Sequence, residues 1–366
     1  MDRAYMAALA CLPGMKILSL PRLLELIGGP AELWRILKEG GSRASAIVGG
    51  GRAAVWSEAC SSMRPMSVLE GLRRRGIEVI LPLDEAYPER LAAIYDPPAL
   101  LFKRGSHLPA QRPSVAVVGS RGASDYGKWA SESIAAGLAQ KGVVVVSGAA
   151  YGVDGHAHQG CIEAGGLTVA VMGCGVDRIY PAGHAELLER IARRGCVVSE
   201  FPPGSDPLPW RFPQRNRIIA GICHAVVVVE ASEKSGALIT ADMALEEGRE
   251  VMAMPGPITS PLCRGTNALI QKGAKLVTCV EDICEELPQR LSDSDGGWSE
   301  EAAQEEPQGR ERQILALLEQ GPRGLDWLAA KTGIPAGELL SVLTSLSIKG
   351  RVLGEAGGKY RLLSRV

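Results

Sequence analysis

AVVVVEASEKSG at residues 225–236, together with FPQRNRIIAG just before it at 212–221, decides the fold of this chain. Four consecutive valines bounded by polar residues are typical of a strand that is buried on both faces. The strand ends in an acid and a Lys-Ser-Gly turn that opens a helix, and such a turn offers free backbone amides to an anion. Arg215 and Arg217, with Arg211 nearby, would add guanidinium groups that suit phosphate. The stretch therefore predicts a site that holds phosphate groups.

The same pattern of apolar run and turn repeats from Ser114 onwards. The runs that we interpret as strands are VAVVG (115–119), VVVVS (143–147), TVAVM (168–172), CVVSE (196–200), AVVVVE (225–230) and REVMAM (249–254), with a last strand near 275–278. They alternate with amphipathic helical stretches, which is typical of βαβ units and predicts one parallel sheet. The turns after these strands would lie together along the carboxyl edge of the sheet, where ligands bind.

Regions of different composition flank this core. Residues 1–75 predict a small helical domain with Pro-Gly and Gly-Gly turns, which is weakly like a helix-hairpin-helix unit; a packing or protein-contact module is an equally good interpretation. Residues 76–290 form the predicted core, whose first part, 77–105, has short strands and one helix and reads as a connector. Residues 291–309 are rich in acids and small polar residues and predict a linker.

The last segment, 310–366, predicts a winged helix, because three helical stretches precede a two-strand hairpin with a Gly-Gly turn. Its third helix, GELLSVLTSLSIKG, carries almost no Arg, Asn or Gln to read bases. We therefore expect this domain to contact protein, or to contact DNA weakly.

Composition limits the class of protein. The chain has 366 residues, of which 46% are hydrophobic and 22% charged, and its apolar runs are far shorter than the roughly 18 residues that cross a bilayer. Nine scattered cysteines without a CxxC pair favour reduced thiols, a cytoplasmic location and no zinc site. A net charge of −1 excludes a generally basic DNA-coating protein, so any contact with nucleic acid must be local.

The first turn of the core is a poor match to a dinucleotide site. Gly119 and Gly122 give GxxG instead of GxGxxG, and the second strand ends in Ser147-Gly148 instead of an acid. Arg121, with Gly119 and Ser120, instead suggests a phosphate cradle with one fixed positive charge. A tight turn with a surface arginine is the competing interpretation.

Acidic residues and histidines give no firm signal of catalysis. Asp154, Asp177, Glu200 and Glu230 fall at predicted strand ends, where acid/base work is possible, but we prefer helix capping and loop hydrogen bonding for most of them. His156 and His158 are two residues apart and would diverge on a helix. No Gly-x-Ser-x-Gly elbow and no Walker lysine motif occurs. We expect no enzyme activity, no metal and no cofactor.

Several motifs in a fixed order are similar to those of one family. They are GSR (119–121), SGAAYGVD (147–154), GCGVDRIYP (173–181), SEFPPG (199–204), FPQRNRIIAG (212–221), EASEKSGALITA (230–241) and GREVMAMPGP (248–257). Over roughly residues 80–285 the chain closely resembles the DNA-processing protein A (DprA, or Smf) family. The N-terminal helices resemble that family's SAM-like or helix-hairpin-helix domain and the tail its winged helix, both more weakly. Tyr151 stands where many family members have an arginine.

The resemblance implies a non-catalytic protein that binds single-stranded DNA on an extended Rossmann-like fold, forms a homodimer, and helps to load the RecA recombinase in natural transformation or recombination. It implies a DNA pocket made of Gly119, Ser120, Arg121, Ser147, Gly148, Phe212, Arg215, Asn216, Arg217, Lys234, Ser235 and Gly236. Phe212 could stack on a base, although a core phenylalanine is nearly as good an interpretation.

Two other classes of function stay open. One is a nucleotide-processing hydrolase of the lysine-decarboxylase-like type, whose PGGxGT turn is replaced here by ASEKSGALIT. The other is a transcription regulator built on the winged helix, against which stands the lack of base-reading side chains in the third helix.

Overall fold

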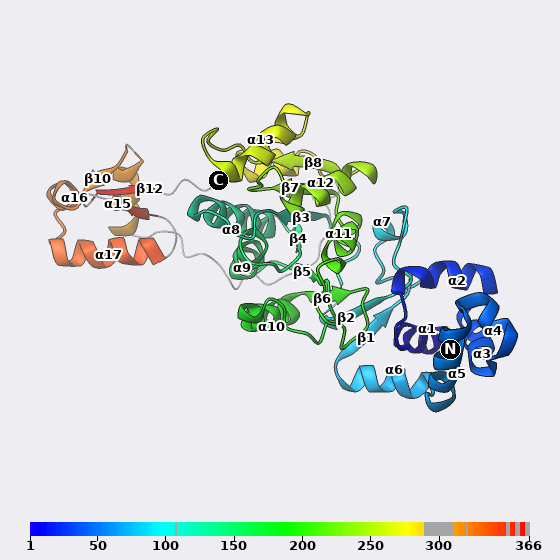
Figure 1. Cartoon of the computed structure of the whole chain (residues 1–366). Coiled ribbons are helices and arrows are strands. Elements are labelled where there is room, and N and C mark those ends of the chain that lie inside the picture. Colours follow the sequence, from blue (N-terminus) through cyan, green and yellow to red (C-terminus); the bar gives the residue numbers. More distant parts are fainter. Residues whose placement is uncertain (107, 289–309, 320, 349–351, 356–358, 363–366) are drawn as a thin grey trace. The chain divides into compact units, whose positions relative to one another are not determined.

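The computed structural model describes the chain except residues 107, 289–309, 320, 349–351, 356–358 and 363–366 (Figure 1). It forms two compact units, Met1–Ser294 and Asp295–Val366, and each is described here by itself. The linker predicted at 291–309 lies outside the described residues.

A twisted sheet is the centre of the first unit. Among the described residues its strand order is β1-β2-β6-β5-β4-β3-β7-β8-β9. The strands are β1 Ile77–Ile80, β2 Leu101–Gly105, β3 Ser114–Val118, β4 Val144–Ser147, β5 Thr168–Val171, β6 Cys196–Ser199, β7 Ala225–Val228, β8 Glu250–Ala253 and β9 Lys275–Leu276. Strands β3 to β9 pair in parallel, and β1 and β2 are antiparallel additions beside β6. The predicted parallel α/β sheet is confirmed.

The region 77–105 is more than the connector that the sequence suggested. Its two short strands extend the sheet at the β6 edge, and α7 (Glu89–Ala92) lies between them in the chain. Leu101, Phe102 and Ile77 of these strands are buried, which explains why this stretch is apolar despite its prolines.

Strand β7 lies between β3 and β8, and all four of its residues are buried. Val226 pairs with Ala116 on one side and Val251 on the other, so its neighbours in the layer are apolar. Burying one valine fully is worth about 1.5 to 3 kcal/mol, and the valine run therefore favours a place for this strand in the interior of the sheet.

Helices cover both faces of the parallel strands. Their bounds are α8 Asp125–Gln140, α9 Val153–Glu163, η2 Ala182–His184, α10 Ala185–Arg194, α11 Arg211–Ile222, α12 Gly236–Glu246, η3 Pro261–Cys263, α13 Arg264–Gln271 and α14 Val280–Cys284. Helix α8 packs on α9, and α11 packs on α12. Figure 1 shows these two pairs on opposite sides of β3 and β4. This layering brings the first turns of α11 and α12 to the same edge of the sheet as the end of β3.

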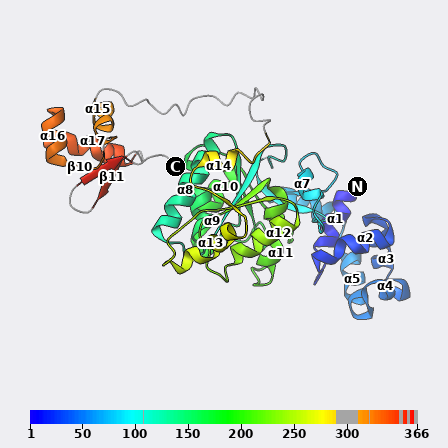
Figure 2. The same ribbon diagram turned by 90° about the horizontal axis from the view of Figure 1, so that it is seen from above.

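The N-terminal helices belong to the same compact unit. They are α1 Asp2–Ala10, η1 Ile17–Ser19, α2 Leu20–Ile27, α3 Pro30–Glu39, α4 Gly41–Val48, α5 Gly50–Ser62 and α6 Pro65–Arg74. Helices α1 and α6 contact β1. In Figure 2 the N-terminal helices lie on the side of α7 that faces away from the sheet. Gly28 ends α2 with φ +91°, a conformation that favours glycine. The predicted helices are confirmed, while the helix-hairpin-helix likeness stays a prediction.

The second unit has its own core. Its elements are α15 Arg310–Leu318, β10 Arg323–Gly324, α16 Leu325–Thr332, α17 Ala336–Ile348, β11 Val352–Glu355 and β12 Lys359–Leu362. Ile314, Leu328 and Leu343 are fully buried in it. The predicted winged-helix arrangement is confirmed, with β10 pairing to β12 as a strand that the sequence did not suggest. No helix in the described parts of the chain is long and apolar enough to cross a membrane.

Candidate nucleic-acid interface

A cavity of about 570 Å³ opens at the carboxyl edge of the sheet, and we call it the edge cavity. Its lining comes from the loop after β3 (118–122), the start of α11 with the segment before it (207–219), and the start of α12 with the loop before it (232–240), together with Ala150, Asp154 and Tyr180. Three of the predicted special turns therefore meet at one place, as expected for an open α/β sheet.

Arg121 is exposed in the loop after β3. Its guanidinium carbon lies 5.3 Å from the centre of the Phe212 ring, and it makes no ion pair with any residue that the structure describes. The charge is therefore available to a ligand while the aromatic ring fixes its position.

The backbone of this loop is tightly packed. A Cβ on Gly119 would lie 2.6 Å from Val153 Cγ2 and 2.9 Å from the Glu230 carbonyl oxygen, so only glycine fits there. The Ser120 amide donates to the Glu230 carbonyl at 2.7 Å, and the Val153 amide donates to the Ser120 carbonyl at 3.2 Å. Arg121 thus stands on a rigid platform formed by the ends of β3 and β7.

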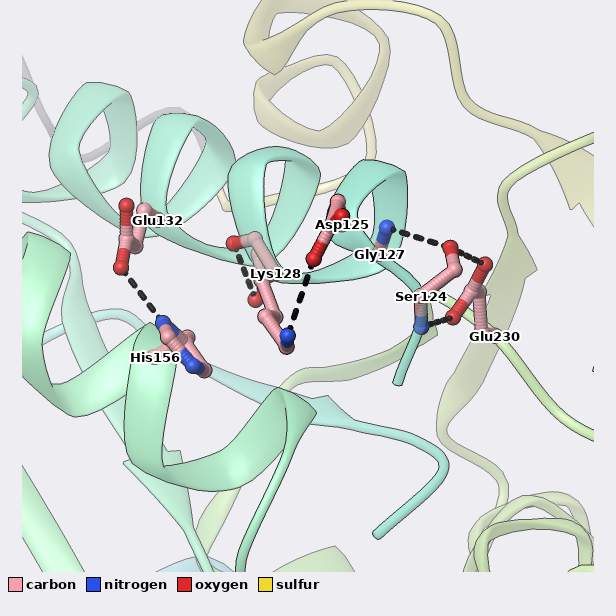
Figure 3. Close-up of polar contacts among 8 residues, drawn as sticks. Ser124, Asp125, Gly127, Lys128, Glu132, His156 and Glu230 are labelled. Atoms are coloured by element: carbon pink, nitrogen blue, oxygen red, sulfur yellow. Dashed lines mark hydrogen bonds and ion pairs between the residues drawn. The ribbon is translucent and has the colours of Figure 1, made fainter. Parts of the chain in front are cut away.

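Glu230, the acid that ends the valine strand, anchors the start of α8 (Figure 3). It is 1% exposed, and its two carboxylate oxygens accept from the Ser124 amide at 2.9 Å and the Ser124 hydroxyl at 2.5 Å. Ser124 in turn caps α8 by accepting from the Gly127 amide at 3.1 Å. The carboxylate therefore has a structural task, in line with the loop hydrogen bonding that we preferred for it.

The same close-up shows His156 of α9 beside Glu132 of α8, with Nδ1 2.5 Å from the carboxylate. His158 lies apart from it, fully buried, with Nδ1 2.7 Å from the Thr168 hydroxyl. The two side chains diverge, as their spacing of two residues predicts.

The start of α12 contributes a polar wall. Ser235 caps the helix, since its hydroxyl accepts from the Ala237 amide at 3.3 Å, and Ser235 and Gly236 both line the edge cavity. The helix dipole at this end favours an anion. Lys234, the preceding residue, is exposed and makes no ion pair within the described chain, but it is not among the lining residues.

The run FPQRNR lies at the beginning of helix α11. A proline in the first turn of a helix loses no intrahelical hydrogen bond, which is why Pro213 is compatible with it. Phe212 is half-buried at the cavity wall, and its ring lies 5.1 Å from that of Tyr180 with a 32° tilt between the planes. Asn216 also lines the cavity and donates to the Gly236 carbonyl at 3.4 Å.

Arg215 borders the edge cavity but is only 4% exposed. Its Nη1 donates to the Gly148 carbonyl at 2.7 Å and to the Val171 carbonyl. Burial lowers the pKa of the Arg215 guanidinium to about 10, against the opposing effect of Asp154. Burial also raises the pKa of Asp154, whose carboxylate accepts from the Gly148 and Ala150 amides. This buried group holds the loop after β4 in shape.

Arg217 points to a different place from the edge cavity. It is 11% exposed, and it forms ion pairs with Glu200 at 2.8 Å and Asp96 at 3.1 Å. Ser147 is also committed elsewhere, because its buried hydroxyl donates to the Val117 carbonyl at 2.7 Å. These two predicted site residues and Lys234 do not line the cavity.

The structure does bring most of the predicted residues together. Those that line the edge cavity are Gly119, Ser120, Arg121, Phe212, Arg215, Asn216, Ser235 and Gly236. Gly148 lines a small adjoining cavity of about 70 Å³.

Sequence reasoning missed two tyrosines. Tyr180 lines both cavities, and Tyr151 lines the small one. Tyr151 is 49% exposed, its ring meets the edge of His184 at 4.9 Å, and its hydroxyl accepts from the Gly183 amide at 3.2 Å. The signal for Tyr180 was its place at the end of the motif GCGVDRIYP, beside a proline.

Comparison with known proteins identifies the family. The model of DNA recombination-mediator protein A matches residues 78–288, and that of the DprA winged helix domain matches residues 299–358. This chain belongs to the DprA family. The DNA processing protein DprA of Streptococcus pneumoniae is 47% identical over 205 residues, which cover 56% of this chain and 72% of the relative. That of Bacillus subtilis is 44% identical over 224 residues, covering 61% and 75%.

Solved structures of DprA proteins share the fold. The X-ray structure of S. pneumoniae DprA is 38% identical and matches 78% of this chain and 96% of its own, with a TM-score of 0.65. A structure of Helicobacter pylori DprA, whose subject is its single-stranded DNA binding mode, is 27% identical over 57% of this chain and 94% of its own, with a TM-score of 0.52. The resemblance found in the motifs is therefore confirmed, and the chain is a DNA-processing protein of this family.

Proposed function

We propose that this protein binds single-stranded DNA in the edge cavity. One observation carries the proposal: the exposed Arg121 guanidinium, which has no ion pair among the described residues, lies over Phe212 in a cavity that the N-terminus of α12 also lines. The cavity thus offers a cation and the positive end of a helix dipole for phosphate, and an aromatic face for a base. The DNA binding mode studied in the H. pylori relative supports this choice of ligand.

The residues divide into ligand contacts and supports. Arg121, Ser235 and Gly236 face a phosphate, and Phe212 with Tyr180 offers a stacking surface worth about 1 to 3 kcal/mol per base. Arg215 supports the wall from inside, because its Nη1 is engaged by two backbone carbonyls, while its Nε has no partner among the described residues. We assign Arg217 to bracing, since Glu200 and Asp96 neutralise it. Lys234 remains a proposed phosphate contact beside the lining residues.

The wider role follows from family membership alone. We propose that the bound strand is passed to the RecA recombinase in natural transformation or recombination, that the protein acts as a homodimer in the cytoplasm, and that it binds DNA without catalysing a reaction on it. The scattered free cysteines support a reducing compartment. Glu230, Glu200 and Asp154 support a non-catalytic role, because each is engaged in structural contacts.

Fluorescence anisotropy with labelled oligo(dT), with duplex DNA and with a mononucleotide as competitors tests the proposal. We expect single strands to bind most tightly and Arg121→Ala to weaken them irrespective of sequence, while the circular dichroism spectrum stays unchanged. Arg52→Ala, an exposed arginine on α5, is the matched control and should bind like the wild type. Wild-type affinity in Arg121→Ala at moderate salt would place the DNA site elsewhere.

A further inference from the structure

A second cavity of about 760 Å³ lies on the other side of the start of α11, and we call it the N-terminal pocket. One wall comes from residues 14–22 around η1, and the other comes from residues 201–205 and 210–214. Both walls belong to the first compact unit. None of the residues that we propose for phosphate contact or base stacking in the edge cavity lines this pocket.

The deep wall of the pocket is aromatic and already holds a cation. The rings of Phe201 and Trp210 meet edge to face at 6.4 Å, and the Arg211 guanidinium carbon lies 4.8 Å from the centre of the first ring and 5.1 Å from that of the second. Phe201 is 3% exposed, whereas Trp210 is 53% exposed. The indole is therefore fixed in place and keeps open surface on which a flat ligand can stack.

The rim of the pocket is basic. Lys16 and Arg22 are exposed, and neither makes an ion pair in the part of the chain that the structure describes. With Arg211 they give the lining three cations, and no acid is among the lining residues. Apolar surface alone would suit a peptide, but unpaired cations beside a half-exposed indole suit a ligand with both a flat ring and an anionic group.

Two polar atoms of this wall also have no partner. Arg211 Nε, a donor, and Gln214 Oε1, an acceptor, are buried without a hydrogen bond to any described residue. Unpaired buried polar groups are costly, and a nucleobase edge carries both kinds of complementary group.

The first turn of α11 separates the N-terminal pocket from the edge cavity. Phe212 and Pro213 line the edge cavity, while their neighbours Trp210, Arg211 and Gln214 line the N-terminal pocket. A helix with its side chains is about 10 to 12 Å across, and successive nucleotides of a strand are about 3.4 Å apart in a stacked helix. A single strand that leaves the edge cavity can therefore reach the second pocket within a few nucleotides.

We infer that the N-terminal pocket holds a further nucleotide of the same DNA strand, with its base on Trp210 and its phosphate between Lys16 and Arg22. The inference rests on the proposed function, and it gives the N-terminal helices a direct part in binding DNA. A free mononucleotide carries the same base and phosphate groups as a nucleotide of the strand. The experiment below distinguishes these two ligands.

Affinities of the full chain for oligo(dT) of about 4 and about 16 nucleotides, lengths that bracket the site sizes of single-strand-binding domains, test the inference. Trp210→Ala should lose about 5- to 140-fold on the long strand and almost nothing on the short one. Lys16→Ala and Arg22→Ala should each flatten the plot of log affinity against log salt by about 0.7 on the long strand alone. Trp129→Ala and Arg52→Ala, at exposed sites on α8 and α5, are the matched controls.

Equilibrium dialysis with dTMP supplies the second arm. Binding of dTMP that Trp210→Ala abolishes, without any change in oligonucleotide affinity, would keep the nucleotide chemistry but assign the pocket to a free nucleotide. Wild-type behaviour of all three variants with the long strand, together with no dTMP binding, would overturn the inference. The proposed function would survive that result, because it depends on Arg121→Ala, and Arg121 does not line the N-terminal pocket.

Discussion

Arg121 and Arg217 carry the same charge in opposite surroundings. Arg121 is exposed on a short loop and touches an aromatic ring, with no acid paired to it in the described structure. Arg217 is 11% exposed and lies between two carboxylates, Glu200 and Asp96. A ligand phosphate can approach the first without displacing anything, whereas it would have to break ion pairs to reach the second. Unpaired charge, and not the number of basic residues in a motif, therefore marks the place for phosphate.

Arg215 lies between these extremes. It borders the edge cavity, yet its Nη1 donates to two backbone carbonyls and its charge stands near Asp154. We therefore propose that Arg215 and Arg217 have structural tasks in α11 and that the arginine contact with the ligand comes from the loop after β3. The following predictions test this division.

The largest effect is expected for Arg217→Ala. The change leaves Glu200, which is 1% exposed, without its partner, and breaking a buried ion pair typically costs about 3 to 5 kcal/mol. Urea unfolding followed by circular dichroism measures the loss. Arg121→Ala, at an exposed and unpaired site, should change the unfolding free energy by less than about 0.5 kcal/mol. Equal stability losses in the two variants would remove the distinction between them.

The pH dependence of that loss has a definite sign. Burial raises the pKa of Glu200 above its ordinary value of 4.5, and Arg217 opposes this rise. An acid with a raised pKa in the folded state binds more protons when folded, so its ionisation lowers stability as pH rises above 4.5. The Arg217→Ala variant lacks the opposing charge. Its free energy of unfolding should therefore fall more steeply with rising pH over this range than that of the wild type. Destabilisation that stays constant with pH would exclude Glu200 as its source.

Phe212→Leu should have the next largest effect, and on DNA affinity instead of stability. Leucine keeps apolar bulk at the cavity wall but gives up base stacking, which is worth about 1 to 3 kcal/mol. The slope of log affinity against log salt should stay the same, because stacking releases no counterions. A flatter slope in this variant would mean that the Arg121 guanidinium has lost its position over the ring.

Lys234→Ala and Arg121→Ala should each flatten the salt slope by about 0.7, the value for one phosphate contact on a single strand. Arg217→Gln removes the charge beside Glu200 and should still retain the wild-type slope if that position only braces the fold. Titrations of oligo(dT) at several salt concentrations compare the three variants. A flattened slope in folded Arg217→Gln would return this residue to the phosphate contacts that its motif first suggested.

The sequence predicted the sheet because its signal is local. Each parallel strand is an apolar run followed by a special turn, and β7 appears as four valines in a row. The convergence of the turns then follows from the rule that parallel strands end at one edge. For the same reason most of the predicted residues reach the edge cavity, since they occupy those turns.

What the sequence could not supply depends on contacts between distant segments. Arg217 is neutralised by Asp96, 121 positions earlier in the chain, and no local pattern shows that pairing. The strands β1 and β2 join the sheet in antiparallel pairs, which depends on where β6 ends up. The start of α11 carries a proline in its first turn, and packing of Ile218 and Ile219 in the core, which no local pattern shows, holds the segment as a helix.

The smallest effect is expected when the winged helix is removed. Every residue that lines the edge cavity belongs to Met1–Ser294, which has its own hydrophobic core, so a fragment of residues 1–290 should fold and keep its DNA site. Its affinity for oligo(dT) should stay within about fivefold of the full chain, a change of ~1 kcal/mol. Anisotropy titrations of both proteins at the same salt concentration measure this, with Arg121→Ala in the fragment as the control for the site. A folded fragment that no longer binds single strands would make the winged helix the principal contact, and the free charge of Arg121 would then need another explanation.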